Sequence, residues 1–242
     1  MQRPDRQPER VLAMFAHPDD PEFVAGGTIA RWRQQGAWVG YVICTGGDKG
    51  SEDTALDAAA LIATREAEQR RAAARLGVET VEFLGYEDGA LEHTLALRRE
   101  LVAAIRRHKP DTVICFDPST RYVGDWYIQH SDHYLSGEAT LAAIYPAARN
   151  GRTFPDLLAA GLEPHTVSQV YLAASNTPTR WIDIGETIDA KIAAMCEHTS
   201  QVGEPEGLAG FLRQMAQGAG ATAQPAPLAY AEAYRFIDSS GG

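Results

Sequence analysis

Residues 10–32 read RVLAMFAHPDDPEFVAGGTIARW, and this stretch decides the fold. A short apolar run comes first, a polar turn with His17, Asp19 and Asp20 follows, and helical spacing then continues to a stop at Gly36. Adjacent carboxylates at the end of a strand repel one another, so a cation or a helix N-terminus is needed to stabilise them. The stretch predicts a strand, a polar site at the turn, and a helix.

The same unit repeats along the chain. Strands are expected within residues 10–17, 38–51, 78–86, 111–119 and 167–175, helices within 22–36, 59–77, 94–110 and 131–149, and a short strand with a further helix within 181–202. Strands that alternate with helices predict an α/β fold, in which helices cover both faces of a mostly parallel sheet.

Polar clusters follow three of these strands. HPDD follows the first, TGGDKGS the second and DPST the fourth. In parallel sheets, ligand sites lie at the carboxyl ends of the strands. We therefore expect one active site at that edge of the sheet.

Length and composition suit one globular domain. The chain has 242 residues, of which 45% are apolar, and a net charge of −10. We expect a single domain over residues 1–242. The Gly-, Ala- and Pro-rich residues from about 203 to 242 are expected to form an extension packed on it, with a short helix near 207–217 and a loosely packed remainder.

The same numbers exclude several partners and locations. A nucleic-acid-binding surface would be basic, and no run approaches the ~18 apolar residues of a membrane-spanning helix. Residues 1–10 are polar and lack the apolar core of a signal peptide. Cys44, Cys115 and Cys196 are far apart and read as buried free thiols. We expect a cytoplasmic protein, and the sequence leaves a homo-oligomer open.

The turn after the first strand could hold a metal ion. His17 and Asp20 can converge on one point while Asp19 projects beside it, and imidazole with carboxylate suits Zn²⁺. A catalytic zinc takes three protein ligands, so a third must come from elsewhere. The alternative is a packed histidine, with Asp19 or Asp20 as the N-cap of the next helix.

A second cluster, HSDH, begins a predicted helix. His130 and His133 are three residues apart, which places both imidazoles on one side of the first turn. One could be the third ligand and the other could face the substrate. The alternative is two helix-start histidines without a function. The other histidines are expected in surface or packing roles: His93, His108, His165 and His198.

Seven segments together resemble the LmbE-like, or PIG-L, family of zinc-dependent N-acetylglucosaminyl deacetylases. They lie between about Val11 and Val202: AHPDDPEF, TGGDKGS, TREAEQRRAAARLGV, LGYEDGAL, IRRHKPDTVICFDPS, HSDH and KIAAMCEHTSQV. The resemblance implies a Rossmann-like three-layer fold. It also implies a hydrolase that removes the acetyl group from an N-acetylglucosamine-type substrate, releasing acetate and a free amine. The substrate would be a small amino sugar, whose further identity the sequence leaves open.

The resemblance also implies residue roles. His17, Asp20 and His133 match the zinc ligands of the family, which implies one Zn²⁺ per chain. Asp19 matches the general base. His130 matches the histidine that stabilises the tetrahedral intermediate or acts as an acid.

Supporting roles are less specific. Arg65 and Asp117 match positions that bind the sugar or support the site, and Asp132 could orient a histidine from outside the ligand set. The chain also departs from common family patterns at Pro21, which follows the two aspartates, and at Ser131, where a proline is common. Neither departure removes a ligand.

Other functions fit the sequence less well. A nucleotide-binding Rossmann module would carry GxGxxG where AHPDDPEF stands, and TGGDKGS is not a phosphate-binding Walker loop. A non-catalytic metal-binding protein would need no free Asp19. An amidase of the same family that acts on a larger acyl group or a thiol-sugar conjugate keeps the same residues. A covalent acyl-enzyme lacks a recognisable nucleophile motif.

Overall fold

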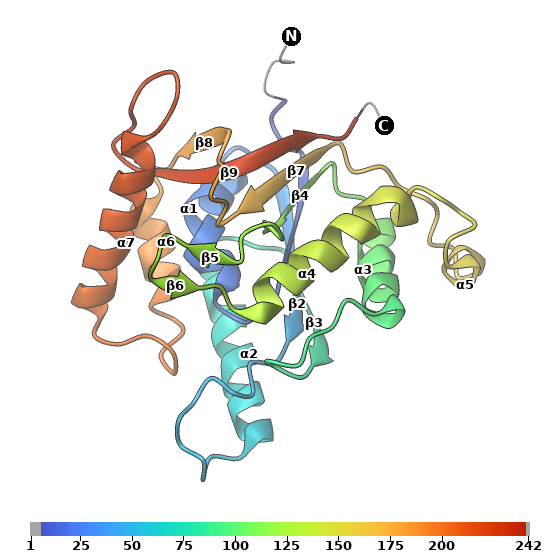
Figure 1. Cartoon of the computed structure of the whole chain (residues 1–242), viewed down its shortest axis with the longest axis horizontal. Coiled ribbons are helices and arrows are strands. Elements are labelled where there is room, and N and C mark those ends of the chain that lie inside the picture. Colours follow the sequence, from blue (N-terminus) through green and yellow to red (C-terminus); the bar gives the residue numbers. More distant parts are fainter. Residues whose placement is uncertain (1–5, 241–242) are drawn as a thin grey trace.

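The computed structural model describes residues 6–240 and shows a seven-stranded sheet between two layers of helices (Figure 1). The strand order is β3-β2-β1-β4-β7-β9-β8. The first five strands in this order run parallel, and β9 runs antiparallel to both β7 and β8. The strands are β1 Arg10–Phe15, β2 Trp38–Thr45, β3 Thr80–Tyr86, β4 Thr112–Phe116, β7 Gln169–Ala173, β8 Arg180–Asp183 and β9 Ala231–Asp238.

Helices cover both faces of this sheet (Figure 1). The α-helices are α1 Asp20–Gln34, α2 Ala58–Arg75, α3 Leu95–His108, α4 Ser131–Ala142, α5 Pro155–Ala159, α6 Ile188–Met195 and α7 Pro205–Ala221. Along β1, Leu12 and Met14 pack with residues of α3 and α4, whereas Val11, Ala13 and Phe15 pack with residues of α1, α2 and α6. A strand buried on both faces reads as a continuous apolar run, as the sequence of β1 does. The predicted α/β class is confirmed.

The sheet reverses its strand order at β1. The chain moves from β1 to β2 and β3 on one side, and β4 then pairs with β1 on the other side. The crevice outside the carboxyl ends of strands at such a switch point is the usual ligand site of open α/β sheets. The polar turn after β1 lies at this point.

Three local features differ from the sequence prediction. The tail is not loosely packed, because β9 lies between β7 and β8 in the central sheet and α7 is longer than the expected helix. The predicted helix over 131–149 ends at Ala142 and continues as a π-helical segment, Ala143–Ala148, with non-helical backbone at Tyr145. A hairpin of β5 Tyr122–Val123 and β6 Tyr127–Ile128 precedes α4 and was not predicted.

The structure of residues 6–240 also bears on the expectations about membrane-spanning helices and cysteines. None of the helices there has both the length and the apolar character needed to cross a membrane. The three cysteines are free, with Cys44 and Cys115 buried and Cys196 partly buried. Residues 1–5 of the polar N-terminal segment lie outside the described residues.

Candidate active site

The turn after β1 places His17, Asp19 and Asp20 in one tight loop. The carboxylate of Asp20 accepts a hydrogen bond of 2.7 Å from the backbone N–H of His17. Asp19 occupies the N-cap position of α1 with a φ of 98°, and its side chain makes no capping hydrogen bond. A non-glycine residue at positive φ is strained, and such strain persists only where the surroundings enforce it. The capping alternative therefore does not explain Asp19.

The start of α4 supplies two imidazoles. Nδ1 of His130 accepts a hydrogen bond of 3.2 Å from the N–H of Asp132 and so caps the helix. The ring of His133 stacks on Phe116 of β4, with centroids 4.1 Å apart. Gly137 permits this approach, because a Cβ there would lie 2.3 Å from the carbonyl oxygen of Phe116.

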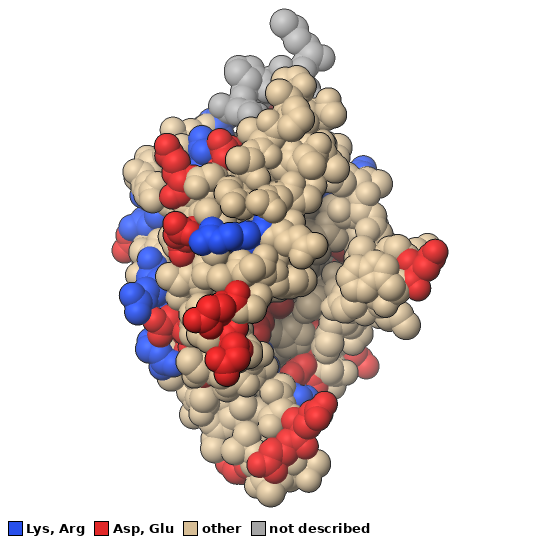
Figure 2. Space-filling model, turned by 90° about the vertical axis from the view of Figure 1, so that its left-hand side faces the viewer, with Lys and Arg blue, Asp and Glu red and all other residues tan. Residues whose placement is uncertain are grey.

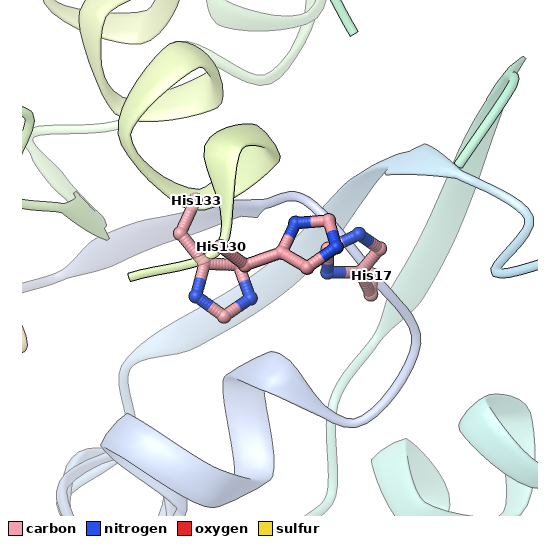
Figure 3. A group of neighbouring side chains, drawn as sticks. All are labelled: His17, His130 and His133. Atoms are coloured by element: carbon pink, nitrogen blue, oxygen red, sulfur yellow. The ribbon is translucent and has the colours of Figure 1, made fainter. Parts of the chain in front are cut away.

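Three imidazoles from two segments converge at this edge (Figure 3). His17 comes from the turn after β1, and His130 and His133 come from the start of α4. One ring nitrogen from each of the three lies within 4.8 Å of the others. The two histidine clusters that lie 113 residues apart in the sequence, counting from His17 to His130, thus form one group.

Asp20 lies between His17 and His133. Its Oδ2 is 3.4 Å from Nδ1 of His17, and its Oδ1 is 3.2 Å from Nε2 of His133. Two ligands at 2.0–2.1 Å from one tetrahedral zinc ion lie about 3.3 Å apart. Each of the two distances is that of a pair of zinc ligands, but they involve different oxygens of Asp20. Among the described residues, the groups with one donor atom from each member within 4.8 Å of the others are His17/His130/His133 and His17/Asp88/Asp132.

Two further carboxylates approach the other side of the His17 ring. Nε2 of His17 lies 3.0 Å from Asp88 and 3.4 Å from Asp132, yet it is buried and makes no hydrogen bond of good geometry with any described residue. His17, Asp88 and Asp132 form a second group that could hold a metal ion. A metal ion bound by this second group would give the buried Nε2 of His17 a partner.

The charges in this cluster shift the pKa values of its members. Burial alone would lower the pKa of His17, but the carboxylates of Asp132, Asp20 and Asp88 outweigh it and raise the pKa to about 12. Burial would raise the pKa of Asp20, yet His133 and His17 lower it. The cluster of acids therefore favours a positive charge in its midst. Burial and the charge of His17 lower the pKa of His130, which favours its neutral form.

Asp19 is fixed from two sides by α2. Its backbone N–H donates a hydrogen bond of 2.8 Å to Oε1 of Gln69, and its Oδ2 lies 3.2 Å from Nη2 of Arg65. Burial and the neighbouring Asp20 raise the pKa of Asp19 to about 6, although Arg65 opposes this shift. A carboxylate with this pKa is mostly ionised at pH 7 and can accept a proton.

Arg65 is buried and does not form the surface pair with Glu68 that its spacing allows. It also donates hydrogen bonds to the carbonyl oxygens of Pro18, at 2.8 Å, and Gly47, at 3.0 Å. Gly47 has a φ of 69°, a backbone conformation that favours glycine, and a Cβ on it would lie 2.2 Å from Nη1 of Arg65. Arg65 thus ties the glycine-rich loop after β2 to the turn after β1.

Asp132 and Asp117 have different surroundings. The carboxylate of Asp132 accepts a hydrogen bond of 2.8 Å from the N–H of Gly89 and approaches His17, whereas only its backbone contacts His130. Asp117 ends β4, and its carboxylate is occupied by Ser119 and Ser175. Asp117 lies outside the set of residues that line the cleft, and its contacts hold the turn.

Sequence reasoning missed a buried network behind Asp19. The amide nitrogen of Gln69 donates to both carboxylate oxygens of Glu22, at 3.0 and 2.9 Å, and Nε2 of His198 lies 3.3 Å from Glu22. All three side chains are fully buried. Because Glu22 accepts only, it fixes the amide of Gln69 so that Oε1 faces Asp19. Asp88 was also missed, although a carboxylate beyond the third strand was a usable signal.

These residues open into a cleft of about 980 Å³. It is lined by His17, Asp19, Asp20, Arg65, Asp88, His130 and His133 together with residues of the hairpin, α1, α6 and α7. Figure 2 shows the molecule hollowed on this side, with acidic atoms at the edge of the hollow. A concave site with convergent polar groups and shifted pKa values has the character of an active site.

The family described as PIG-L, GlcNAc-PI de-N-acetylase, matches residues 12–144, which include both histidine clusters. This chain belongs to the PIG-L family. The resemblance noted from its motifs is thereby confirmed.

Relatives of this PIG-L family member carry deacetylase names. The chain is 32% identical over 196 residues to the diacetylchitobiose deacetylase of Thermococcus kodakarensis, covering 81% of this chain and 71% of that protein. It is 32% identical over 239 residues to the 1D-myo-inositol 2-acetamido-2-deoxy-alpha-D-glucopyranoside deacetylase of Actinosynnema mirum, covering 81% of each.

A solved structure of the same kind superposes closely. The N,N'-diacetylchitobiose deacetylase from Pyrococcus horikoshii, complexed with its inhibitor MPG, matches with a TM-score of 0.86 and 28% identity. The match covers 96% of this chain and 84% of that one. This agreement confirms the three-layer α/β fold of the PIG-L chain.

Proposed function

We propose that this chain is a zinc-dependent hydrolase that removes the acetyl group from an N-acetylglucosamine-type substrate. One observation carries the proposal. The carboxylate of Asp19 lies in an open cleft beside histidine and aspartate side chains of the kind that bind zinc. Its contacts with Gln69 and Arg65 hold it apart from those side chains. The deacetylase names of its relatives support the same reaction.

His17, Asp20 and His133 would hold one zinc ion per chain. Their donor types support this set, and so does the place of Asp20, one oxygen of which lies 3.4 Å from His17 and the other 3.2 Å from His133. When bound, zinc polarises a carbonyl oxygen and lowers the pKa of a water molecule. In this set Nδ1 of His17 would face the ion, and Asp88 and Asp132, which lie beside Nε2, would hold the ring in place. In the second group, His17/Asp88/Asp132, Nε2 of His17 would bind the ion instead.

The residues around these ligands have distinct tasks in hydrolysis. Asp19 takes the proton of the attacking water, and Arg65 and Gln69 fix its position. His130 is held at Nδ1 by the helix N-terminus, so its Nε2–H can donate a hydrogen bond to the carbonyl oxygen as negative charge grows there. The proton held by Asp19 then passes to the leaving nitrogen. Water is consumed, the C–N bond breaks, and acetate and an amine are formed.

A substrate panel tests the proposal. The zinc-loaded protein would be incubated with N-acetylglucosamine, its chitooligomers, N-acetylglucosaminyl-inositol and N-acetylglucosaminyl-malate, and both acetate and free amine would be measured. We expect equal amounts of both products from at least one substrate and none after chelation. Binding of zinc without any product would support the non-catalytic alternative, and turnover confined to longer acyl groups would support the amidase. A cytoplasmic location and homo-oligomers remain predictions.

A further inference from the structure

The cleft is lined by two kinds of side chain. Around the histidines the lining is charged and includes Lys49 and Asp88 from the loops after β2 and β3. Towards α6 and α7 most of the side chains are apolar, among them Phe23, Leu208 and Phe211, and the polar ones are Gln201 and Glu204. Helices α6 and α7 lie together at the side of the sheet opposite α3 (Figure 1). The cleft is therefore amphipathic.

The apolar lining is open to solvent. Phe211 lies near the start of α7 and is 51% exposed, and its ring stacks on Phe23 of α1 with centroids 6.3 Å apart. Tyr127 of the hairpin also lines the cleft and is 41% exposed. Exposed apolar side chains gathered in a concave site mark a surface that a ligand covers.

The acetylated sugar by itself does not account for this apolar lining. The acetyl group carries one methyl, and the hydroxyls of a sugar need hydrogen-bonding groups. On the apolar side, the amide nitrogen of Gln201 already donates to the carbonyl oxygen of Gly50 and to Ser200. A volume of about 980 Å³ is also near the upper end of the ~300–1,000 Å³ typical of small-molecule sites.

We propose that the substrate is an N-acetylglucosamine glycoside with an apolar aglycone, which packs on the surface formed by Phe23, Leu208 and Phe211. This rests on the proposed deacetylase function. The sugar lies over the charged lining with its acetamide at Asp19 and His130, and the aglycone extends towards α7. A second sugar in place of the aglycone could reach Gln201 and Glu204, but it would place its remaining hydroxyls against apolar side chains.

A series of glycosides tests this assignment. Methyl, propyl, hexyl and phenyl β-glycosides of N-acetylglucosamine would be compared with diacetylchitobiose, with kcat/KM measured from amine release by the zinc-loaded protein. Each methylene buried on binding is worth about a fourfold gain. We expect kcat/KM to rise by up to this factor per methylene until the apolar surface is covered, and the hexyl and phenyl glycosides to exceed diacetylchitobiose.

Substitutions on α7 test whether the gain from longer aglycones comes from the apolar surface. Phe211→Ala and Leu208→Ala should each reduce the hexyl-to-methyl ratio of kcat/KM several-fold. Met215→Ala is the matched control, because Met215 is an exposed apolar residue of the same helix that does not line the cleft. It should leave the ratio unchanged.

The outcomes separate this inference from the proposed function. Turnover of the methyl glycoside without dependence on chain length, or a preference for diacetylchitobiose, would overturn the apolar aglycone and keep the deacetylase. A gain from longer N-acyl groups instead of longer aglycones would overturn it as well. Absence of acetate release from every glycoside would reject both.

Discussion

Two buried charged clusters in this molecule differ in how well their members are satisfied. Glu232 of β9 accepts hydrogen bonds from Lys191 and from the N–H groups of Gly27 and Thr28, at 3.1 and 2.8 Å, and from Tyr234 at 3.1 Å. One positive and one negative charge meet there. In the cluster at the carboxyl end of β1, three carboxylates surround His17, whose Nε2 lacks a good hydrogen bond.

The difference distinguishes a structural cluster from a proposed ligand site. The Lys191–Glu232 pair joins α1, α6 and β9 and needs nothing more, so its role is complete in the folded chain. The cluster around His17 has excess negative charge, which costs free energy unless a cation or a ligand compensates for it. Substitutions in the cluster around His17 should therefore change zinc content and reaction rate. Substitutions in the Lys191–Glu232 cluster should change the stability of the fold.

The largest effect is expected for Asp20→Ala. Asp20 lies 3.2–3.4 Å from both His17 and His133, so its removal leaves two proposed ligands without the third. Zinc content and activity should fall together to background. Metal analysis and an amine-release assay on the same sample would measure both. A variant that keeps one zinc per chain would show that Asp20 is not a ligand.

Asp19→Asn should keep the metal and lose the rate. The amide has the same shape but cannot accept a proton, and general-base catalysis is worth ~10²–10⁴-fold. We expect one zinc per chain, an unchanged melting temperature and kcat lower by about that factor. Full zinc with near-wild-type turnover would assign the proton transfer to another group, with Asp132 or His130 as the next candidates.

Lys191→Met should act on stability alone. It leaves Glu232 buried without its positive partner, and breaking a buried ion pair costs about 3–5 kcal/mol. Urea unfolding should show this loss, while kcat measured below the unfolding transition stays close to wild type. The double variant Lys191→Met/Glu232→Gln should recover part of the stability. A large fall in kcat in the single variant would contradict the separation of the two clusters.

Gln69→Ala should give the smallest effect. It removes the acceptor that holds the N–H of Asp19, and a displacement of about 1 Å at a catalytic group can cost ~10²-fold in rate. We expect kcat to fall about 10- to 100-fold with zinc content and KM nearly unchanged. Glu22→Gln should produce a similar fall, because the amide of Gln69 is then free to flip. A matching loss of stability without loss of kcat would make the network purely structural.

Local patterns predicted much of this molecule. The alternation of strands and helices gave the fold class because each apolar run is long enough to show its period. The two histidine clusters could be expected at one edge of the sheet, because each lies at a predicted strand end or strand-to-helix junction. The choice of His17, Asp20 and His133 as a ligand set came from the family resemblance, because spacing alone left His130 and His133 equally possible.

Other features depend on contacts that no local pattern shows. Glu22 and His198 are 176 residues apart, and their pairing follows only from the docking of the segment after α6 against α1 and α2. The hairpin strands are two residues each and carry no periodic signal. Strand β9 was hidden because its neighbours are rich in Gly, Ala and Pro, although Ala231, Tyr234 and Phe236 pack in the core as strand residues do.

The position of β9 governs the order in which the chain can assemble. Strand β8 pairs only with β9 among the described strands, and β7 has β9 as its second neighbour. During synthesis, β1 to β4 and β7 can pair as soon as they emerge, but the open edge of β7 must wait until residues 231–238 appear. Helix α7, which packs on β9, reaches its final place only then. On the ribosome, the proposed metal ligands can therefore gather early, whereas the apolar side of the cleft is completed last.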